Sequence, residues 1–176
     1  PILDGYNNMI RTSAEGMAAV IGGCNELSLK GFDVAYKEPN AFGERIARNQ
    51  SLILQHESHL DAVRDIAKGS YFIENLTEEL AHKGWSFFKE IESEDGYLEA
   101  LKSGWLQSQI EKSAEVEQAS YNKNEKVLIG ANKHSKEEDL NTIVEQPMLK
   151  ATPSGNIVKP IVAERLSENQ EKELLV

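Results

Sequence analysis

Residues 42–70, FGERIARNQSLILQHESHLDAVRDIAKGS, form the stretch around which the rest of the chain is organised. Apolar residues recur in it at the spacing of a helix and predict one amphipathic helix in its first half. Asn40 is the predicted N-cap, because its side chain can accept a hydrogen bond from an unpaired first-turn amide. The residues that predict the apolar face are Phe42, Ile46, Ile53 and Leu60.

Charged and polar side chains gather on the other face of this helix. A solvated surface would account for them, and so would a buried network of ion pairs. Since buried arginines need partners, we favour a network with a structural role. The residues of this predicted network are Arg45, Arg48, Asn49, Glu57 and Asp65. We predict no metal ligands, because His56 and His59 lack the further converging ligands that a metal site needs.

The composition limits the classes of partner. The net charge of −10 argues against nucleic acid and against an anionic membrane surface, because both attract basic patches. No apolar run reaches the roughly 20 residues of a transmembrane helix. The single cysteine, Cys24, excludes an internal disulfide and fits a reducing compartment. We therefore expect a cytoplasmic protein without nucleic-acid or membrane partners, and a buried, structural Cys24.

The periodicities along the whole chain predict a mainly α fold with a few short strands. Besides the central helix, we expect helices over about 6–21, 75–91, 97–102, 105–122 and 163–175. The candidate strands are 24–29, 71–73 and 126–131. A single strand cannot bury itself, so the first of them implies missing neighbours or a partner chain. Prolines make 145–160 an extended arm.

The central stretch also carries a family resemblance. Residues 45–57, RIARNQSLILQHE, closely resemble the signature of the adenosylcobalamin-dependent methylmalonyl-CoA mutases. The family pattern closes with Asp-Pro-x-Gly-Gly-Ser, which Asp65, Gly69 and Ser70 match in part. The resemblance covers about residues 4–140. The positions that depart from the signature are His56, Ala62, Ile66 and Lys68.

The resemblance implies a fold and a division of the chain. Family members are similar to a TIM-type barrel that binds the CoA ester, joined to a cobalamin-binding domain. On this basis residues 1–40 are the last helix and strand of the barrel, and 41–134 are a helical region behind it. Residues 135–176 are an extended arm with a terminal helix. The expected fold is therefore the carboxy-terminal piece of a TIM (β/α)8 barrel plus a helical linker region.

The resemblance also bears on catalysis. In catalytic subunits of the family, the strand after Gly-Gly leads into His-Thr-Asn-Ala-x-Asp-Glu, whose Asn and Glu lie near the adenosyl group. Aligned without gaps, those two positions are Lys30 and Val34, while Asp33 keeps the aspartate. This loss, and the segment FDVAYKEPNAF at 32–42, resemble the non-catalytic small subunit. No histidine stands in the cobalt-ligating motif Asp-x-His-x-x-Gly, so we expect no cofactor on this chain.

No residue is therefore predicted to be catalytic. Four positions near the barrel end are candidates for cofactor binding, although a structural role at a helix start is favoured for them. They are Tyr6, Asn7, Asn8 and Arg11.

The implied function is that of a piece of a mutase small subunit. The complete enzyme would be an isomerase that interconverts methylmalonyl-CoA and succinyl-CoA by adenosylcobalamin radical chemistry, with a large catalytic subunit as partner and an acyl-CoA as substrate. We expect the fragment alone to be inactive and to form a homodimer or expose an apolar face. One alternative is an assembly module that binds no ligand. Another is a catalytic acyl-CoA mutase of different specificity, in which Lys30 and Val34 are tolerated.

Overall fold

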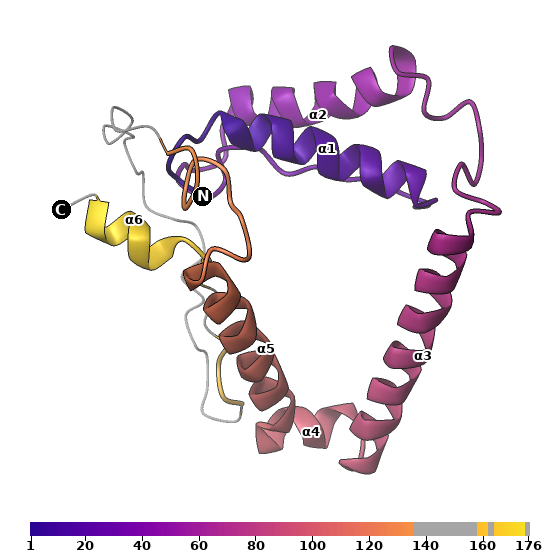
Figure 1. Ribbon diagram of the computed structural model, residues 1–176, viewed down its shortest axis with the longest axis vertical. Helices are drawn as coiled ribbons and strands as arrows, with labels where there is room; N and C mark the ends of the chain where they lie inside the picture. The colour runs from indigo at the N-terminus through magenta and orange to yellow at the C-terminus, as the bar shows by residue number, and fades with distance from the viewer. Residues whose placement is uncertain (136–157, 162–163, 175–176) are drawn as a thin grey trace. The chain divides into compact units, whose positions relative to one another are not determined.

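A computed structural model describes residues 1–135, 158–161 and 164–174. In this part of the chain the secondary structure is helical, with no strand assigned, so the predicted mainly α character is confirmed. None of the described helices is long and apolar enough to cross a membrane. The helices are α1 (Asn7–Ile21), α2 (Ala41–His56), α3 (Tyr71–Ser93), α4 (Tyr97–Ser103), α5 (Trp105–Asn122) and α6 (Glu168–Leu174) (Figure 1).

The chain forms two compact units, which are described separately. The described parts of the first unit are 1–67, 127–135 and 164–174, and those of the second are 68–126 and 158–161. The division predicted from the sequence, with boundaries after residues 40 and 134, stays a prediction.

The first unit is built on α1 and α2, which pack against each other (Figure 1). Asn40 caps α2 as predicted, since its Oδ1 accepts from the Gly43 amide at 2.9 Å. The Nε2 of Gln50 in α2 lies within hydrogen-bond distance of three α1 oxygens, at 2.7–2.8 Å. Beside the two helices is a small hydrophobic core of Ile2, Phe32 and Tyr36.

The predicted apolar face of α2 is only partly buried, because Ile46 packs beside the small core whereas Phe42 is 55% exposed. In α1 the apolar face with Ile10 and Met17 is exposed, at 69% and 44%, and the face that packs on α2 is polar or small. In α2 the buried positions are small or polar apart from one leucine, whereas Ile53 is 45% exposed. Hydrophobic periodicity did not find these faces because hydrogen bonds and close backbone approach hold the two helices together. The buried residues of α2 are Gly43, Ala47, Gln50 and Leu54.

The segment after α1 is extended but pairs with nothing in the described residues. Gly23, with φ +82°, ends the helix, and the Cys24 amide donates to the Ala19 carbonyl at 3.1 Å. Over 26–30 no backbone hydrogen bond is recorded, and the side chains alternate between exposed and half-buried. A strand at 24–29 was therefore the wrong assignment for this structure. The segment has the alternation of a strand but lacks a neighbour to pair with.

The second unit consists of α3, α4 and α5. Residues 71–73, predicted as a strand, are the first turn of α3, because Ser70 occupies the N-cap position and the Glu74 amide donates to its carbonyl at 2.9 Å. Gly96 and Gly104, with φ +86° and +83°, bound α4, which agrees with the helix predicted over about 97–102. In Figure 1, α3 and α5 leave α4 in different directions, and no residue of α3 is buried.

The predicted strand at 126–131 is also wrong, because 128–133 is a tight turn. Asn132 Oδ1 accepts from the Leu128 amide at 2.7 Å, and the Gly130 amide donates to the Lys133 carbonyl at 2.8 Å. Gly130, at φ +79°, makes this reversal possible. Most of the predicted extended arm lies outside the described residues. The predicted terminal helix is confirmed as α6, although it is shorter than expected.

Candidate functional site

A groove in the first unit is the candidate functional site. Its volume is about 620 Å³, and its lining is mainly apolar. The extended segment 27–31 and the part of α2 from Glu44 to Leu52 both contribute to the lining, as does Pro39. Small-molecule pockets have this size and character. The groove also contains the peptide groups of the unpaired extended segment.

Two positions with a predicted functional meaning line this groove. They are Lys30 and Val34, at which the family motif has an asparagine and a glutamate. Lys30 is exposed and Val34 is half-buried. An ammonium group only donates hydrogen bonds and a valine side chain makes none, so the pair cannot replace an amide and a carboxylate. These two positions therefore do not supply the amide and carboxylate of the catalytic motif, although Glu38, Glu44 and Arg48 also line the groove.

Asp33, which also lines the groove, has a structural position. It is only 4% exposed, and its Oδ2 accepts from Nδ2 of Asn40 at 2.7 Å. Asp33 therefore orients the residue that caps α2. The carboxylate lies directly against Gly43, where an added Cβ would overlap Oδ1 and lie 3.0 Å from Cγ. The aspartate that the family motif keeps thus joins the end of the extended segment to the first turn of α2.

The predicted barrel-end positions meet at the start of α1. Asn8 is buried, and its Nδ2 donates to the carbonyls of Pro1 and Phe32 at 3.0 Å each. Its Oδ1 accepts from Nη1 of Arg11 at 2.7 Å. Tyr6 is 71% exposed and stacks on Phe32 with ring centroids 5.8 Å apart. Asn8 and Arg11 bind the chain's own backbone and each other, as in the structural role that we favoured.

The same cluster holds the turn at 128–133. Arg11 Nη2 donates to the Ile129 carbonyl, and Asn7 Nδ2 donates to Asp4 Oδ2. Gly130 approaches this pair so closely that an added Cβ would lie 3.0 Å from Asp4 Cβ and 3.4 Å from Asn7 Nδ2. The polar residues at the start of α1 therefore connect distant parts of the sequence.

Tyr36 is the titratable side chain with the largest shift beside this cluster. Burial raises its pKa from 10.0 to about 12, and electrostatic interactions with Asp33 and Tyr6 add to the effect. The phenol is 5% exposed and belongs to the small core. A phenol with a raised pKa stays neutral at physiological pH, so Tyr36 acts as a packing residue.

The members of the predicted polar network are distributed over the surface. Four of them are exposed and Asn49 is half-buried. Among the described residues, no recorded hydrogen bond or ion pair joins any two of these side chains. The network therefore stays a prediction for the complete protein. The exposed members are Arg45, Arg48, Glu57 and Asp65.

The histidines and the cysteine lie away from the groove. His56 ends α2, and His59 follows in a turn with φ +52°. No group of three or more potential metal ligands was found in the part of the chain that the structure describes. Cys24 is exposed, so the expectation that it is buried was wrong. It follows the end of α1, where no neighbouring element covers it.

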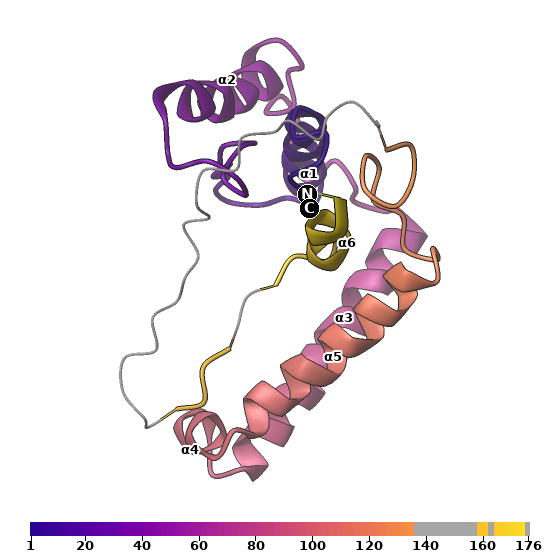
Figure 2. The ribbon, with the colours of Figure 1, turned by 90° about the vertical axis from the view of Figure 1, so that its left-hand side faces the viewer.

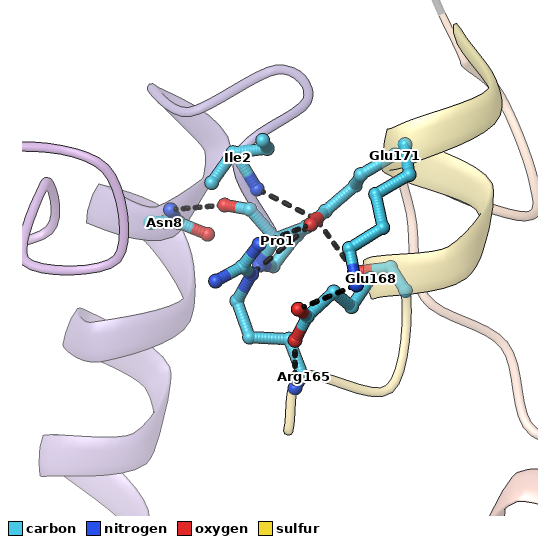
Figure 3. A network of polar contacts seen from close by, with 8 residues as sticks. Pro1, Ile2, Asn8, Arg165, Glu168 and Glu171 are labelled. Carbon is cyan, nitrogen blue, oxygen red and sulfur yellow. Dashed lines mark hydrogen bonds and ion pairs between the residues drawn. The ribbon is translucent and has the colours of Figure 1, made fainter. Parts of the chain in front are cut away.

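A buried polar clasp holds α6 to the beginning of the chain (Figures 2 and 3). Glu171 is 1% exposed, and its Oε1 accepts from the Ile2 amide at 2.9 Å and from Ser167 Oγ at 2.7 Å. Its Oε2 lies 2.9 Å from Nη2 of Arg165. The carboxylate is therefore fully paired, as a buried charge must be.

Gln50, Gly43 and Glu171 are important residues that the sequence analysis missed. Gln50 and Gly43 lie in α2 but do not belong to the apolar periodicity that predicted this helix. Glu171 belongs to a short acidic helix with few apolar residues, and nothing local marks it as buried. A glycine in the first turn of α2 was the one signal available, since glycine there implies close approach of another group.

Comparisons with known proteins agree with the resemblance. A family model described as "Methylmalonyl-CoA mutase" matches residues 2–173. The chain is 38% identical over 169 residues to the methylmalonyl-CoA mutase of Rhizobium meliloti, which covers 96% of this chain and 23% of that protein. It is 48% identical over 107 residues to the "Methylmalonyl-CoA mutase small subunit" of Streptomyces virginiae. This alignment covers 61% of this chain and 17% of that protein. It is 37% identical over 131 residues to the "Methylmalonyl-CoA mutase large subunit" of Porphyromonas gingivalis. This alignment covers 74% of this chain and 18% of that protein. The chain thus spans less than a quarter of the length of these relatives.

Proposed function

Because the chain belongs to the methylmalonyl-CoA mutase family, we propose that it is a scaffold piece of a mutase small subunit. The observation that carries this proposal is that α1 exposes its apolar face and buries its polar one. Its polar face packs on α2 while its apolar face, with Ile10 and Met17, is exposed. An exposed apolar helix face is typical of a surface that a further part of the fold covers. In a subunit several times longer, the remaining chain would cover it.

The extended segment supports the same proposal. Residues 26–30 have the side-chain alternation of a strand and no recorded backbone partner. In a TIM-type barrel such a segment would be the last strand and would pair with neighbours on both sides. Helix α1 before it and α2 after it would then lie outside the barrel. The groove at 27–31 is where a neighbouring part of the subunit would pack.

The groove does not fit adenosylcobalamin. The positions that the resemblance places near the adenosyl group are Lys30 and Val34, and neither supplies the amide or carboxylate of the catalytic motif. Asp33 is already bound to Asn40. None of the four histidines lines the groove. We therefore assign the family's radical chemistry to another subunit and derive no catalytic step from these residues.

At the level of the complete enzyme, the proposed activity is the isomerisation of methylmalonyl-CoA and succinyl-CoA. The proposed partner is a large catalytic subunit, in keeping with the small-subunit name of the Streptomyces relative. This chain would contribute rigidity, through the cap of α2 and the clasp at Glu171, rather than reacting groups. A cytoplasmic location is part of the same proposal, since a single cysteine fits a reducing compartment.

Mutase turnover by the complete subunit tests this proposal. We expect none from that subunit with adenosylcobalamin and methylmalonyl-CoA, and turnover once a large subunit is added. A matched control restores the motif with Lys30→Asn and Val34→Glu together, to show whether these two positions alone limit activity. Turnover by the unmodified subunit alone would refute the scaffold assignment.

An assembly module that binds no ligand is the second candidate, and the exposed apolar residues of α3 favour it. Phe72 and Leu80 in this helix are 75% and 60% exposed, as in a docking surface. Adenosylcobalamin or acyl-CoA binding by the complete subunit, measured by calorimetry, would exclude this candidate. A stable complex with the large subunit and no ligand binding would favour it over the first.

A further inference from the structure

A short non-helical segment of the second unit, residues 158–161, lies against α5 (Figure 1). Two polar side chains of α5 hold this segment, which we call the strap. Nε2 of Gln107 donates to the Lys159 carbonyl at 3.2 Å, and the Lys159 ammonium donates to Glu111 Oε1 at 2.5 Å. No other hydrogen bond or ion pair is recorded between the strap and the described residues. Its polar attachment is therefore made at a single residue.

The two contacts on α5 form one row. Gln107 and Glu111 are four residues apart, so their side chains lie on the same face of the helix. Gln107 also donates to the Leu101 carbonyl in the last turn of α4, at 3.0 Å, and it is only 1% exposed. The buried carboxamide of Gln107 thus joins the end of α4 to the strap, and Glu111 adds a second attachment at the surface.

The closed strap leaves one buried group without a partner. Oε1 of Gln107 is buried and makes no hydrogen bond. Such an acceptor costs free energy, because in water it would be hydrogen-bonded. The ion pair on the other side of the balance is weak, since the side chains of Lys159 and Glu111 are 57% and 54% exposed. Opening the strap would admit water to Gln107 Oε1 and remove the cost of burying it unpaired.

Proline prepares the open strap to close again. Pro160 has a fixed φ, and the residue before a proline is restricted to extended backbone. That residue is Lys159, which makes both contacts with α5. The open strap therefore has fewer conformations to lose on closing than an ordinary segment would have.

We propose that residues 158–161 are a strap that opens and closes on α5, and that ionic strength sets its position. At low salt, the attraction between Lys159 and Glu111 keeps the strap closed on Gln107. At about 1 M salt the Debye length is about 3 Å, so the attraction of this exposed pair is screened and the strap opens. The open state presents the carboxamide of Gln107, a donor and an acceptor, to water.

Nuclear magnetic resonance of the Lys159 and Ile161 amides tests the proposal. The heteronuclear NOE should show both amides rigid at low salt and mobile at about 1 M salt. Glu111→Gln should lower the ratio of closed to open strap about two- to fivefold at low salt, and should remove most of the salt dependence. Glu117→Gln is the matched control, because it removes another exposed ion pair of α5, with Lys126, and should leave the strap closed.

A variant at Gln107 tests the buried attachment separately from the ion pair. Gln107→Glu sets a carboxylate against two carbonyls, so the strap should be open at every salt concentration. Circular dichroism checks that each variant keeps its helix content.

Three results would overturn the proposal. They are amides of the unmodified chain that are equally rigid at low and high salt, amides that are already mobile at low salt, and equal effects of Glu111→Gln and Glu117→Gln. None of these readouts involves mutase turnover, so their outcome leaves the proposed function untouched.

Discussion

Gly43→Ala tests the packing between the extended segment and α2. On helix preference alone, alanine would stabilise α2 by up to about 1 kcal/mol. In the folded chain, however, the new methyl group would overlap Asp33 Oδ1 and lie 3.0 Å from its Cγ. Asp33 is 4% exposed and cannot move into open solvent without losing its bond to Asn40.

The expected loss follows from those contacts. Displacing the carboxylate breaks a charge-assisted hydrogen bond worth about 1.5–3 kcal/mol. It also disturbs the N-cap residue, whose bond to Gly43 contributes about 0.5–2 kcal/mol. With the helix preference subtracted, we expect Gly43→Ala to destabilise the first unit by about 1–4 kcal/mol.

Native-state hydrogen exchange of the α2 amides is the appropriate assay, because it reports the first unit separately from α3–α5. The control is the same substitution in an Asp33→Ala background, where the collision is gone. There Gly43→Ala should be neutral or stabilising, and the double-mutant cycle should show a coupling of about 1–3 kcal/mol. Equal effects in both backgrounds would refute the packing described for Asp33.

Three further predictions concern other buried groups. Gln50→Glu should destabilise the α1–α2 pair by about 2 kcal/mol or more at neutral pH, because it sets a carboxylate against the oxygens that Gln50 Nε2 now contacts. Stability should partly return as the pH falls, because protonation removes the charge of the carboxylate. Tyr36 has a pKa raised to about 12 by burial, so its contribution to stability is complete below pH 10 and lost as the pH rises through about 12; Tyr36→Phe should remove this loss in alkaline unfolding curves. Glu171→Gln should free α6 and speed tryptic cleavage after Arg165, whereas Glu173→Gln, on the exposed side of α6, should not.

The sequence predicted the helices well where capping and glycine punctuation were clear. Asn40 capped α2 as expected, and Gly96 and Gly104 bounded α4. These signals act over a few residues, so they do not depend on the rest of the fold. The strand predicted at 24–29 failed for the opposite reason. A strand exists only when a neighbour supplies the hydrogen bonds, and for 26–30 no such neighbour is recorded.

The buried side chains were harder to predict than the helices. Ile10 and Met17 stand at helical spacing in α1 and are nevertheless exposed, as expected for a piece of a larger fold whose apolar face lacks its partner. The contacts between α1 and α2 instead use Gln50 and the buried Gly16 of α1, against which Leu54 of α2 packs, and neither residue type carries a periodic signal. Asn8 and Arg11, for which a structural role was favoured, donate to backbone carbonyls of Pro1, Phe32 and Ile129, of which the last two lie far from them in sequence and could not be predicted from local pattern.

The most direct test of the central claim is hydrogen exchange of the backbone amides of residues 26–30. In this chain alone they have no recorded partner and should exchange nearly as fast as in an unfolded peptide. In the complete subunit, where we propose that neighbouring strands pair with this segment, they should be among the protected amides. Fast exchange in the complete subunit would contradict the account of this chain as a piece of a larger barrel.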